Sequence, residues 1–385
     1  MRLLWINAAA RARLTVGAMG HLPPWLACLA AAFEPTRRNR RPELALARTR
    51  ICGRAVPITQ RPLLEKPFCR LVHLERDTRR DDPRVLLVAP LSGHFPALLR
   101  DLLAALAPDH DLYVTDWADA RDVPVESGGF GVEENIAYVL EFIRHLKSPR
   151  HVIALCQSAM PALAATALLA ARDDVAQPQT LTLMNGMLDP RIAPTRIDRL
   201  ARLRSLVWFE RNTVGAVPPG YAGEGRLVHP AGFQHAALTA YLARHLATGG
   251  ELLDKVLSDD GEEGAGQPFL ELYLSLMDLP AEFFLDTIRL VFHEFALPRQ
   301  RLLWRGERVE PVAIAKTALM TIEGEHDDVS APGQTRVAHE LCRSIPGDRR
   351  VHHLEPGIGH FGIFHGRVWR SAIMPRVRAF IRDMV

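Results

Sequence analysis

Apolar and polar positions along the chain follow two different periods. Short apolar runs that predict β-strands occur at 71–76, 84–90, 111–117, 151–156 and 180–186. Segments with helical spacing lie between them, at 97–108, 132–146 and from 157 to about 172. The run at 84–90 is continuously apolar, as expected for a strand that is buried on both faces. This alternation predicts an α/β fold with a mostly parallel, doubly wound sheet.

The alternation stops between residues 190 and 310, where helical patterns and Gly/Pro-rich connections appear without a comparable strand. It resumes with strands at 317–327 and 349–356 and helices near 333–343 and 367–383. The interruption predicts a helical cap inserted between two strands of the sheet. We therefore expect four parts, which are a poorly defined N-terminal segment (1–64), a core in two pieces (65–189 and 311–385) and the cap (190–310).

Composition limits the classes of protein that fit. With 48% hydrophobic and 24% charged residues and a net charge of +3, the chain of 385 residues is ordinary for a soluble globular protein. Its N-terminal apolar stretches are too short to span a bilayer and do not form a convincing signal peptide, so no transmembrane segment is expected. Five cysteines without metal-type spacing indicate reduced thiols in the cytoplasm and no metal site.

Positive charge is concentrated at residues 37–54, which hold seven arginines and one glutamate. We expect a solvated and partly disordered arm there. Contact with an anionic surface is the alternative. No aromatic residues interleave with these arginines, which argues against a nucleic-acid partner.

The strand at 151–156 ends on a cysteine, in the stretch Ala154-Leu155-Cys156-Gln157-Ser158. Many hydrolases place a nucleophile on such a sharp strand-to-helix turn, with small residues two positions before and after it. Ala154 and Ser158 meet that requirement less well than glycine would. The following helix would stabilise a thiolate and offer the backbone amide of Gln157 to an oxyanion. A buried, inert cysteine is the alternative.

Partners for this cysteine follow in the order acid, then histidine. Asp327 lies in a loop just after the strand at 317–327, and Gly324 three residues earlier favours it over Asp328. His360 lies in the glycine-bracketed loop after the strand at 349–356, with three nearby rivals, His352, His353 and His365. A second oxyanion amide is expected from the loop after 84–90, and the amide of His94 is the candidate donor.

These motifs resemble those of the intracellular polyhydroxyalkanoate depolymerases, in particular the C-terminal domain of the poly(3-hydroxybutyrate) enzymes. The stretches that carry the resemblance span about 65–385 and include RVLLVAPLSGHF, HVIALCQSAMPALAA, TIEGEHDDVSAPGQT and IGHFGIF. The resemblance implies an α/β-hydrolase fold with an inserted helical cap. It also implies Cys156 as nucleophile, Asp327 as the acid and His360 as the base. Family members usually carry other residues where Ser158 and Phe361 stand here.

The implied activity is cleavage of ester bonds in amorphous polyester of intracellular granules, with the polymer or the granule surface as partner. No cofactor is expected, although coenzyme A could replace water as acyl acceptor, and a homo-oligomer stays open. Three alternatives remain: a small-molecule thioesterase or lactone hydrolase, an acyltransferase like the polyester synthases, and a non-catalytic granule-associated protein.

Overall fold

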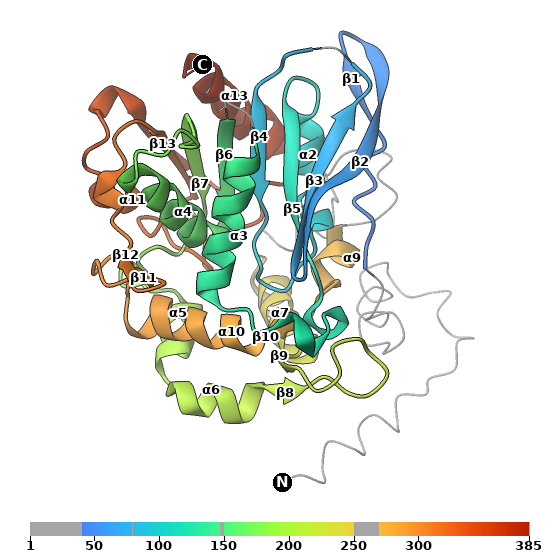
Figure 1. The fold of residues 1–385 in the computed structure, drawn as a ribbon, viewed down its shortest axis with the longest axis vertical. Coiled ribbons are helices and arrows are strands. Elements are labelled where there is room, and N and C mark those ends of the chain that lie inside the picture. The colour runs from blue at the N-terminus through green and yellow to red at the C-terminus, as the bar shows by residue number, and fades with distance from the viewer. Residues whose placement is uncertain (1–40, 79, 147–149, 250–268, 385) are drawn as a thin grey trace. The chain divides into compact units, whose positions relative to one another are not determined.

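The computed structural model describes residues 41–78, 80–146, 150–249 and 269–384. At its centre lies a nine-stranded sheet (Figure 1). In spatial order its strands are β1 (Arg48–Ile51), β2 (Arg54–Lys66), β3 (Cys69–Arg76), β5 (Asp111–Trp117), β4 (Arg84–Val88), β6 (Arg150–Leu155), β7 (Thr180–Met184), β13 (Ala318–Gly324) and β14 (Arg350–Glu355). Strands β5 to β14 in this order pair in parallel, whereas β1, β2 and β3 pair antiparallel along one edge.

Helices cover both faces of this sheet. On one face, α3 (Val132–His145) packs against α4 (Ala159–Ala171), and on the other α2 (Arg100–Leu106) packs against α13 (Met374–Asp383) (Figure 1). Most of α4 is buried because its sequence is alanine and leucine on all sides. The order of strands and the helices on both faces are those of an α/β-hydrolase, which confirms the predicted fold class.

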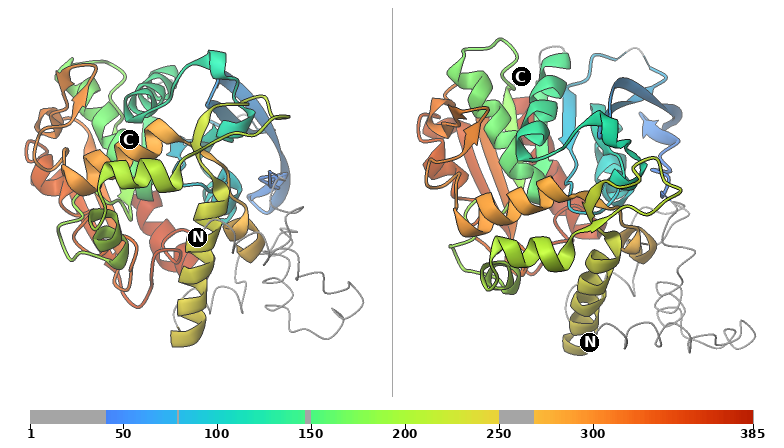
Figure 2. Two further views of the ribbon diagram at one scale, coloured as in Figure 1. Left: turned by 90° about the horizontal axis from the view of Figure 1, so that it is seen from below. Right: turned by 60° about the horizontal axis from the view of Figure 1, so that its bottom comes forward.

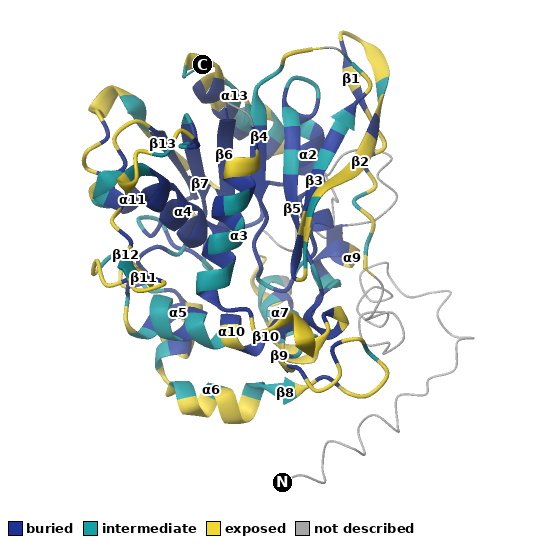
Figure 3. Ribbon diagram, in the orientation of Figure 1, coloured by how far each residue is buried: buried dark blue, intermediate teal, exposed yellow. Residues whose placement is uncertain are grey.

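Burial follows the apolar runs of the sequence. Every residue of β6, β7 and β13 is buried, as the continuous apolar patterns predict for strands covered by helices on both faces (Figure 3). Short helical turns complete this part of the chain: η2 (Pro96–Leu99), η3 (Ala120–Asp122), η4 (Val125–Ser127), η5 (Cys156–Ser158), α11 (Ala338–Leu341), η8 (Gly347–Arg349), α12 (Gly366–Val368) and η9 (Trp369–Ile373).

A largely helical insertion separates β7 from β13. Its elements are α5 (Arg196–Arg202), α6 (Leu206–Thr213), β8 (Gly215–Ala216), β9 (Leu227–His229), α7 (Ala231–Thr248), α9 (Phe269–Leu274), β10 (Leu279–Pro280), α10 (Ala281–Thr287), η6 (Ile288–His293), β11 (Leu303–Trp304), β12 (Glu307–Arg308) and η7 (Pro311–Ala313). Helices α6 and α10 lie side by side at one end of the sheet (Figure 2). No helix in the described ranges is long and apolar enough to cross a membrane.

Some expectations about the N-terminal part were wrong. Strand β1 and most of β2 fall within 1–64, yet these two strands form the edge of the sheet. They escaped prediction because β2 is mostly exposed and rich in polar residues, as edge strands often are. The arginine-rich stretch from Arg48 onward is therefore a paired strand and not a solvated arm. Residues 1–40, including the start of that stretch, lie outside the described residues.

Other expectations differ in detail. The helix near 333–343 is reduced to the four residues of α11, preceded by turns. The division at 190 and 310 stays a prediction, since the chain from Arg41 onward forms one unit. Residues 250–268 of the predicted cap lie outside the described residues. The four described cysteines are unpaired thiols.

His151 in β6 makes stability depend on pH. Its side chain is fully buried, with Nδ1 3.0 Å from the Thr180 hydroxyl. Burial lowers the pKa of His151 to about 4, with a smaller contribution from His110. The unfolded chain therefore binds a proton below about pH 6.5 that the folded chain rejects. We expect this residue to remove about 1.4 kcal/mol of unfolding free energy per pH unit between about pH 6 and 4.

Denaturant unfolding at a series of pH values, compared with the His151→Gln variant, measures this contribution. The variant should show a shallower loss of stability on acidification. His326→Gln is the control, because His326 is exposed and its replacement changes no buried group. This variant should lose stability on acidification as the wild type does. Equal slopes for the wild type and His151→Gln would contradict the prediction.

Candidate active site

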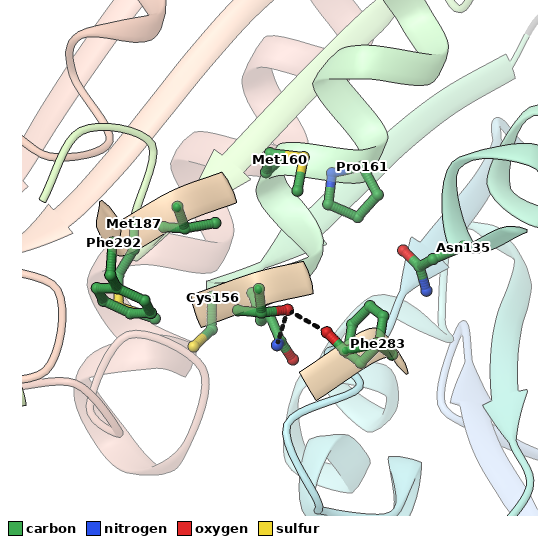
Figure 4. A pocket seen from close by; sticks show the side chains of 10 residues that line it. Asn135, Cys156, Met160, Pro161, Met187, Phe283 and Phe292 are labelled. Atoms are coloured by element: carbon green, nitrogen blue, oxygen red, sulfur yellow. Dashed lines mark hydrogen bonds between the residues drawn. The ribbon is translucent and has the colours of Figure 1, made fainter. Parts of the chain in front are cut away.

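Cys156 stands at the turn between β6 and α4. Its backbone adopts φ +50°, in the left-handed region that residues other than glycine seldom enter. Such a conformation costs roughly 1–2 kcal/mol and turns the side chain out of the line of the strand. In Figure 4, Cys156 lies between Phe292 and Met187 on one side and Phe283 on the other. Cys156 is only 9% exposed, because side chains of the insertion cover the turn.

Small residues and one hydroxyl group allow the sharp turn at Cys156 to pack against its neighbours. The hydroxyl of Ser158 accepts a hydrogen bond from the Leu155 amide at 2.8 Å and lies 2.7 Å from the Val88 carbonyl oxygen. It therefore ties the turn to the neighbouring strand β4. On the other side, a Cβ atom at Gly186 would approach that of Ala159 to 2.4 Å. A side chain at Gly186 would push against the first turn of α4, so glycine keeps the chain close there.

Asp327 and His360 come together as predicted. Nδ1 of His360 donates a hydrogen bond of 2.8 Å to Oδ2 of Asp327. The other carboxylate oxygen, Oδ1, accepts from the amides of Val329 and Ser330, both at 2.8 Å. The carboxylate is thus fixed by three donors while its side chain is fully buried. With Nδ1 engaged, Nε2 is the nitrogen of His360 left to face the thiol.

The neighbouring carboxylate of Asp328 has a different set of partners. It accepts hydrogen bonds from Tyr241 and Arg244 of α7, and His245 of the same helix lies 3.4 Å away. Burial by itself would raise the pKa of Asp328, but these partners hold it below its ordinary value. Asp328 therefore anchors the insertion, and the structure distinguishes it from Asp327.

Close contact between two loops sets the distance from Asp327 to His360. Gly324 ends β13, and a Cβ atom there would lie 2.8 Å from the carbonyl oxygen of Ile358. That same oxygen accepts a hydrogen bond of 2.8 Å from the amide of His326. On the other side, the side-chain amide of Asn185 donates to the His360 carbonyl oxygen at 2.7 Å. The glycine was part of the argument for Asp327, whereas the contribution of Asn185 was missed.

The charge state of His360 reflects its neighbours. Burial would lower the pKa of His360, but the negative charges of Asp327 and of the Cys156 thiolate, with hydrogen bonds to both, raise it well above the ordinary value. A raised pKa favours the protonated form of His360, and an imidazolium is the partner that activates the cysteine in many cysteine hydrolases. The three predicted side chains thus form one electrostatic unit.

A cavity of about 610 Å³ opens above the thiol, and both Cys156 and His360 line it. This volume is within the range of about 300–1,000 Å³ that is typical of ligand pockets. The lining is mostly apolar and comes largely from the insertion: Leu200, Leu238, Leu279, Phe284, Ile288 and Phe292, with Phe361 and Phe364 from the core. The rival histidines His352, His353 and His365 do not contribute to this lining.

The two candidate oxyanion donors lie at the same cavity. Gln157 follows Cys156 in η5, and its side chain donates to the Thr287 hydroxyl at 3.3 Å, one of the dashed bonds in Figure 4. The loop of His94 is held by a bond of 2.8 Å from the Met277 amide to the Gly93 carbonyl oxygen. Nε2 of His94 donates to the Tyr273 carbonyl oxygen at 3.0 Å. Burial lowers the pKa of His94 to about 4, which keeps the ring neutral.

Contacts between the insertion and the core were the part that sequence reasoning missed. Thr287, Tyr241 and Arg244 carry no motif, and their partners lie 84 or more residues away in the chain. Asn185 had a signal, since an Asn-Gly pair directly after a strand indicates a tight turn.

Among the described residues, no group of three or more His, Cys, Asp or Glu side chains is arranged to hold a metal ion.

Comparison with known proteins places the chain in a family. The model of the family described as PHB de-polymerase C-terminus matches residues 185–385, which is just over half of the chain. The chain belongs to this PHB depolymerase family. The matched region of this chain contains Asp327, His360 and the whole insertion. Cys156, Gln157 and His94 lie before it, so their roles rest on the geometry. No curated protein matches the sequence.

Solved structures of hydrolases are similar to this depolymerase-family chain at low identity. An epoxide hydrolase from Vigna radiata has 14% identity and a TM-score of 0.48, with 85% of this chain and 98% of that chain covered. A hydrolase from Pseudomonas aeruginosa PA01 has 14% identity and a TM-score of 0.48, covering 84% and 98%. A monoglyceride lipase variant from Saccharomyces cerevisiae has 10% identity and a TM-score of 0.47, covering 87% and 96%.

The different bonding of the two neighbouring aspartates gives a direct test. Asp327→Asn keeps the size of the side chain but presents an amide where His360 Nδ1 needs an acceptor. By analogy with the orienting aspartate of a serine triad, we expect ester turnover to fall by about 10⁴-fold. Asp328→Asn should cost less than about tenfold, because its partners lie on α7 and not on His360. Steady-state hydrolysis of a soluble short-chain ester checks both values, and the reverse ranking would refute the assignment.

Proposed function

We propose that this protein is an intracellular polyhydroxyalkanoate depolymerase that cleaves backbone ester bonds through a thioester on Cys156. The family and the fold support an ester hydrolase. The observation that carries the finer proposal is the arrangement at the cavity. A cysteine on a left-handed turn and a histidine bonded to a buried aspartate line one apolar chamber.

Acylation follows from this geometry. His360 Nε2 takes the proton of the Cys156 thiol, and Asp327 stabilises the resulting imidazolium. The thiolate attacks the ester carbonyl carbon, and the tetrahedral oxyanion is stabilised by the backbone amides of Gln157 and His94. When the C–O bond breaks, His360 returns its proton to the leaving alkoxide. One polymer fragment departs with a new hydroxyl end, and the other remains as a 3-hydroxyacyl thioester on Cys156.

Deacylation reverses these roles. His360 accepts a proton from water, and the resulting hydroxide attacks the thioester carbonyl carbon. The thiolate leaves and pairs with the protonated His360, and the carboxylic acid product releases its own proton to the solvent and departs as a carboxylate. The thiol of coenzyme A is the alternative acceptor and would give an acyl thioester. Water is our choice, because the family and the fold support an ester hydrolase.

The apolar lining supports a polyester as substrate. Phe284, Ile288 and Phe292 come from α10 and η6 and face the chamber above Cys156. A polyester segment offers methyl and methylene groups to such side chains, and burial of this apolar surface favours binding. A small soluble ester needs little more than the turn and the oxyanion amides. The location at polymer granules in the cytoplasm is part of the proposal.

Replacement of the nucleophile tests the mechanism. Cys156→Ala should abolish ester cleavage, because no group is left to form the thioester. Cys156→Ser should be strongly impaired, since the much higher pKa of a serine hydroxyl does not suit a site arranged for a thiolate. Hydrolysis of emulsified amorphous polymer is measured beside thermal unfolding as the control for folding. Activity near that of the wild type in Cys156→Ala would eliminate Cys156 as nucleophile.

Polar replacements in the chamber test the substrate class. Leu238 of α7 and Ile288 of η6 line the cavity, whereas Leu227 of β9 belongs to the insertion but does not. Leu238→Asn and Ile288→Thr should lower polymer turnover by about tenfold each, because each removes apolar contact with the chain. Turnover of a soluble short-chain ester should change far less.

Leu227→Asn is the matched control and should leave both rates unchanged. Equal losses on the polymer and the short ester in a folded variant would show that the insertion does not select for polymer. Polymer turnover by the wild type no faster than background, with rapid turnover of the short ester, would favour a small-molecule esterase.

A further inference from the structure

The outer face of the insertion carries an unusual group of exposed apolar side chains. Five of the thirteen exposed large apolar side chains in the described part of the chain fall between residues 197 and 208. They are Ile197, Leu200, Leu203, Val207 and Trp208. Leu203 is 71% exposed and Leu200 54%, so neither is a core residue at the margin of a helix. We call these five residues the α5–α6 face, and Figure 3 shows α6 with exposed segments at the far end of the insertion.

Val207 and Trp208 are exposed although α6 packs against the insertion, because the helix buries its opposite side. Leu206 and Phe209 of α6 pack against the apolar group formed by Ala201, Ile288 and Phe292. The helix thus has one side toward the chamber wall and one side toward solvent. Contiguous apolar residues on a solvent-facing side are typical of a binding surface.

Two residues of the face lie at the chamber. Ile197 and Leu200 line the cavity above Cys156, together with Arg196. Leu203, Val207 and Trp208 continue along the chain away from it. Any partner that covers the face therefore lies at the mouth of the site. A second copy of the protein there would hinder access of an insoluble substrate, whereas the substrate itself would be brought to the mouth.

The polar side chains of the face also fit one kind of partner. Between 196 and 208 the exposed charged residues are all arginines: Arg196, Arg199 and Arg204. The carboxylate in this stretch, Asp198, is buried and accepts from the Thr195 amide and the Gln334 side chain. The next carboxylate along the chain is Glu210. The face thus presents apolar groups and hydrogen-bond donors.

A polyester has the complementary chemistry. Its carbonyl oxygens accept hydrogen bonds, its backbone has no donors, and the rest of its surface is apolar. We propose that the α5–α6 face is the surface by which the protein adsorbs to solid amorphous polyester, so that a chain end or loop can enter the chamber. This inference rests on the proposed function for its choice of partner, but adsorption can be measured apart from cleavage.

The experiment uses the full-length protein with Cys156→Ala, so that the polymer particles stay intact. Protein is mixed with amorphous poly(3-hydroxybutyrate) particles, the particles are sedimented, and the bound fraction is measured. Leu203→Ser with Val207→Ser should reduce adsorption by about tenfold through lost apolar contact. Both residues lie outside the cavity lining, so in the Cys156 protein the same pair should leave turnover of a soluble short-chain ester unchanged.

The matched control replaces two exposed valines elsewhere, Val175→Ser with Val351→Ser. Val175 precedes β7 and Val351 is the second residue of β14, so both lie at the opposite end of the parallel strands from Cys156. The control pair should adsorb like the parent protein. Undiminished adsorption of the Leu203/Val207 pair, or equal loss in the control pair, would overturn the proposal.

Two further results would also overturn it. If sedimentation velocity shows a dimer that the Leu203/Val207 substitutions dissociate while adsorption persists, the face belongs to a second copy. Binding to anionic phospholipid vesicles without binding to bare polymer would assign it to a membrane surface.

Adsorption that depends on the face, in a protein whose Cys156 form does not cleave polymer, would support the adsorption proposal and refute the proposed function.

Discussion

Cys156 is held in a left-handed backbone conformation that an ordinary residue avoids, and the surroundings of the site serve to keep it there. The Ser158 hydroxyl ties the turn to β4, and Gly186 lets β7 pass close to the first turn of α4. From the insertion, Thr287 accepts a hydrogen bond from the Gln157 side chain. Strain of roughly 1–3 kcal/mol persists only where neighbours over-determine the conformation. The turn is therefore as much a product of the insertion and the neighbouring strands as of β6.

Two adjacent carboxylates bind different parts of the structure. Asp327 fixes His360 and accepts two amides of its own loop, whereas Asp328 accepts from Tyr241 and Arg244 of α7. The acid of the site and the anchor of the insertion thus share one short loop. A displacement of α7 would act on that loop directly, and through it on the orientation of His360. The loop that holds Asp327 and Asp328 thus links the position of α7 to the orientation of His360.

An apolar chamber and an exposed apolar face impose opposite demands on one small insertion. The chamber wall needs side chains packed against Ile288 and Phe292, while the α5–α6 face leaves Leu203 and Val207 open to water. Arg199 and Arg204 are exposed in the same segment and keep it hydrated, since a guanidinium group remains charged at any physiological pH. The same segment can thus stay hydrated and still present apolar side chains at the mouth of the site.

The sequence alone predicted the alternation of strands and helices from β3 onward, and it singled out the cysteine, aspartate and histidine of the proposed site. Those features depend on local patterns: apolar runs, glycines beside loops, and a cysteine at a strand end. The tertiary structure decided what has no local pattern. Strands β1 and β2 join the sheet although they are polar, because an edge strand needs pairing more than burial. Asp327 differs from its neighbour Asp328 through partners on β14's loop and α7, far away in sequence, that only packing brings near.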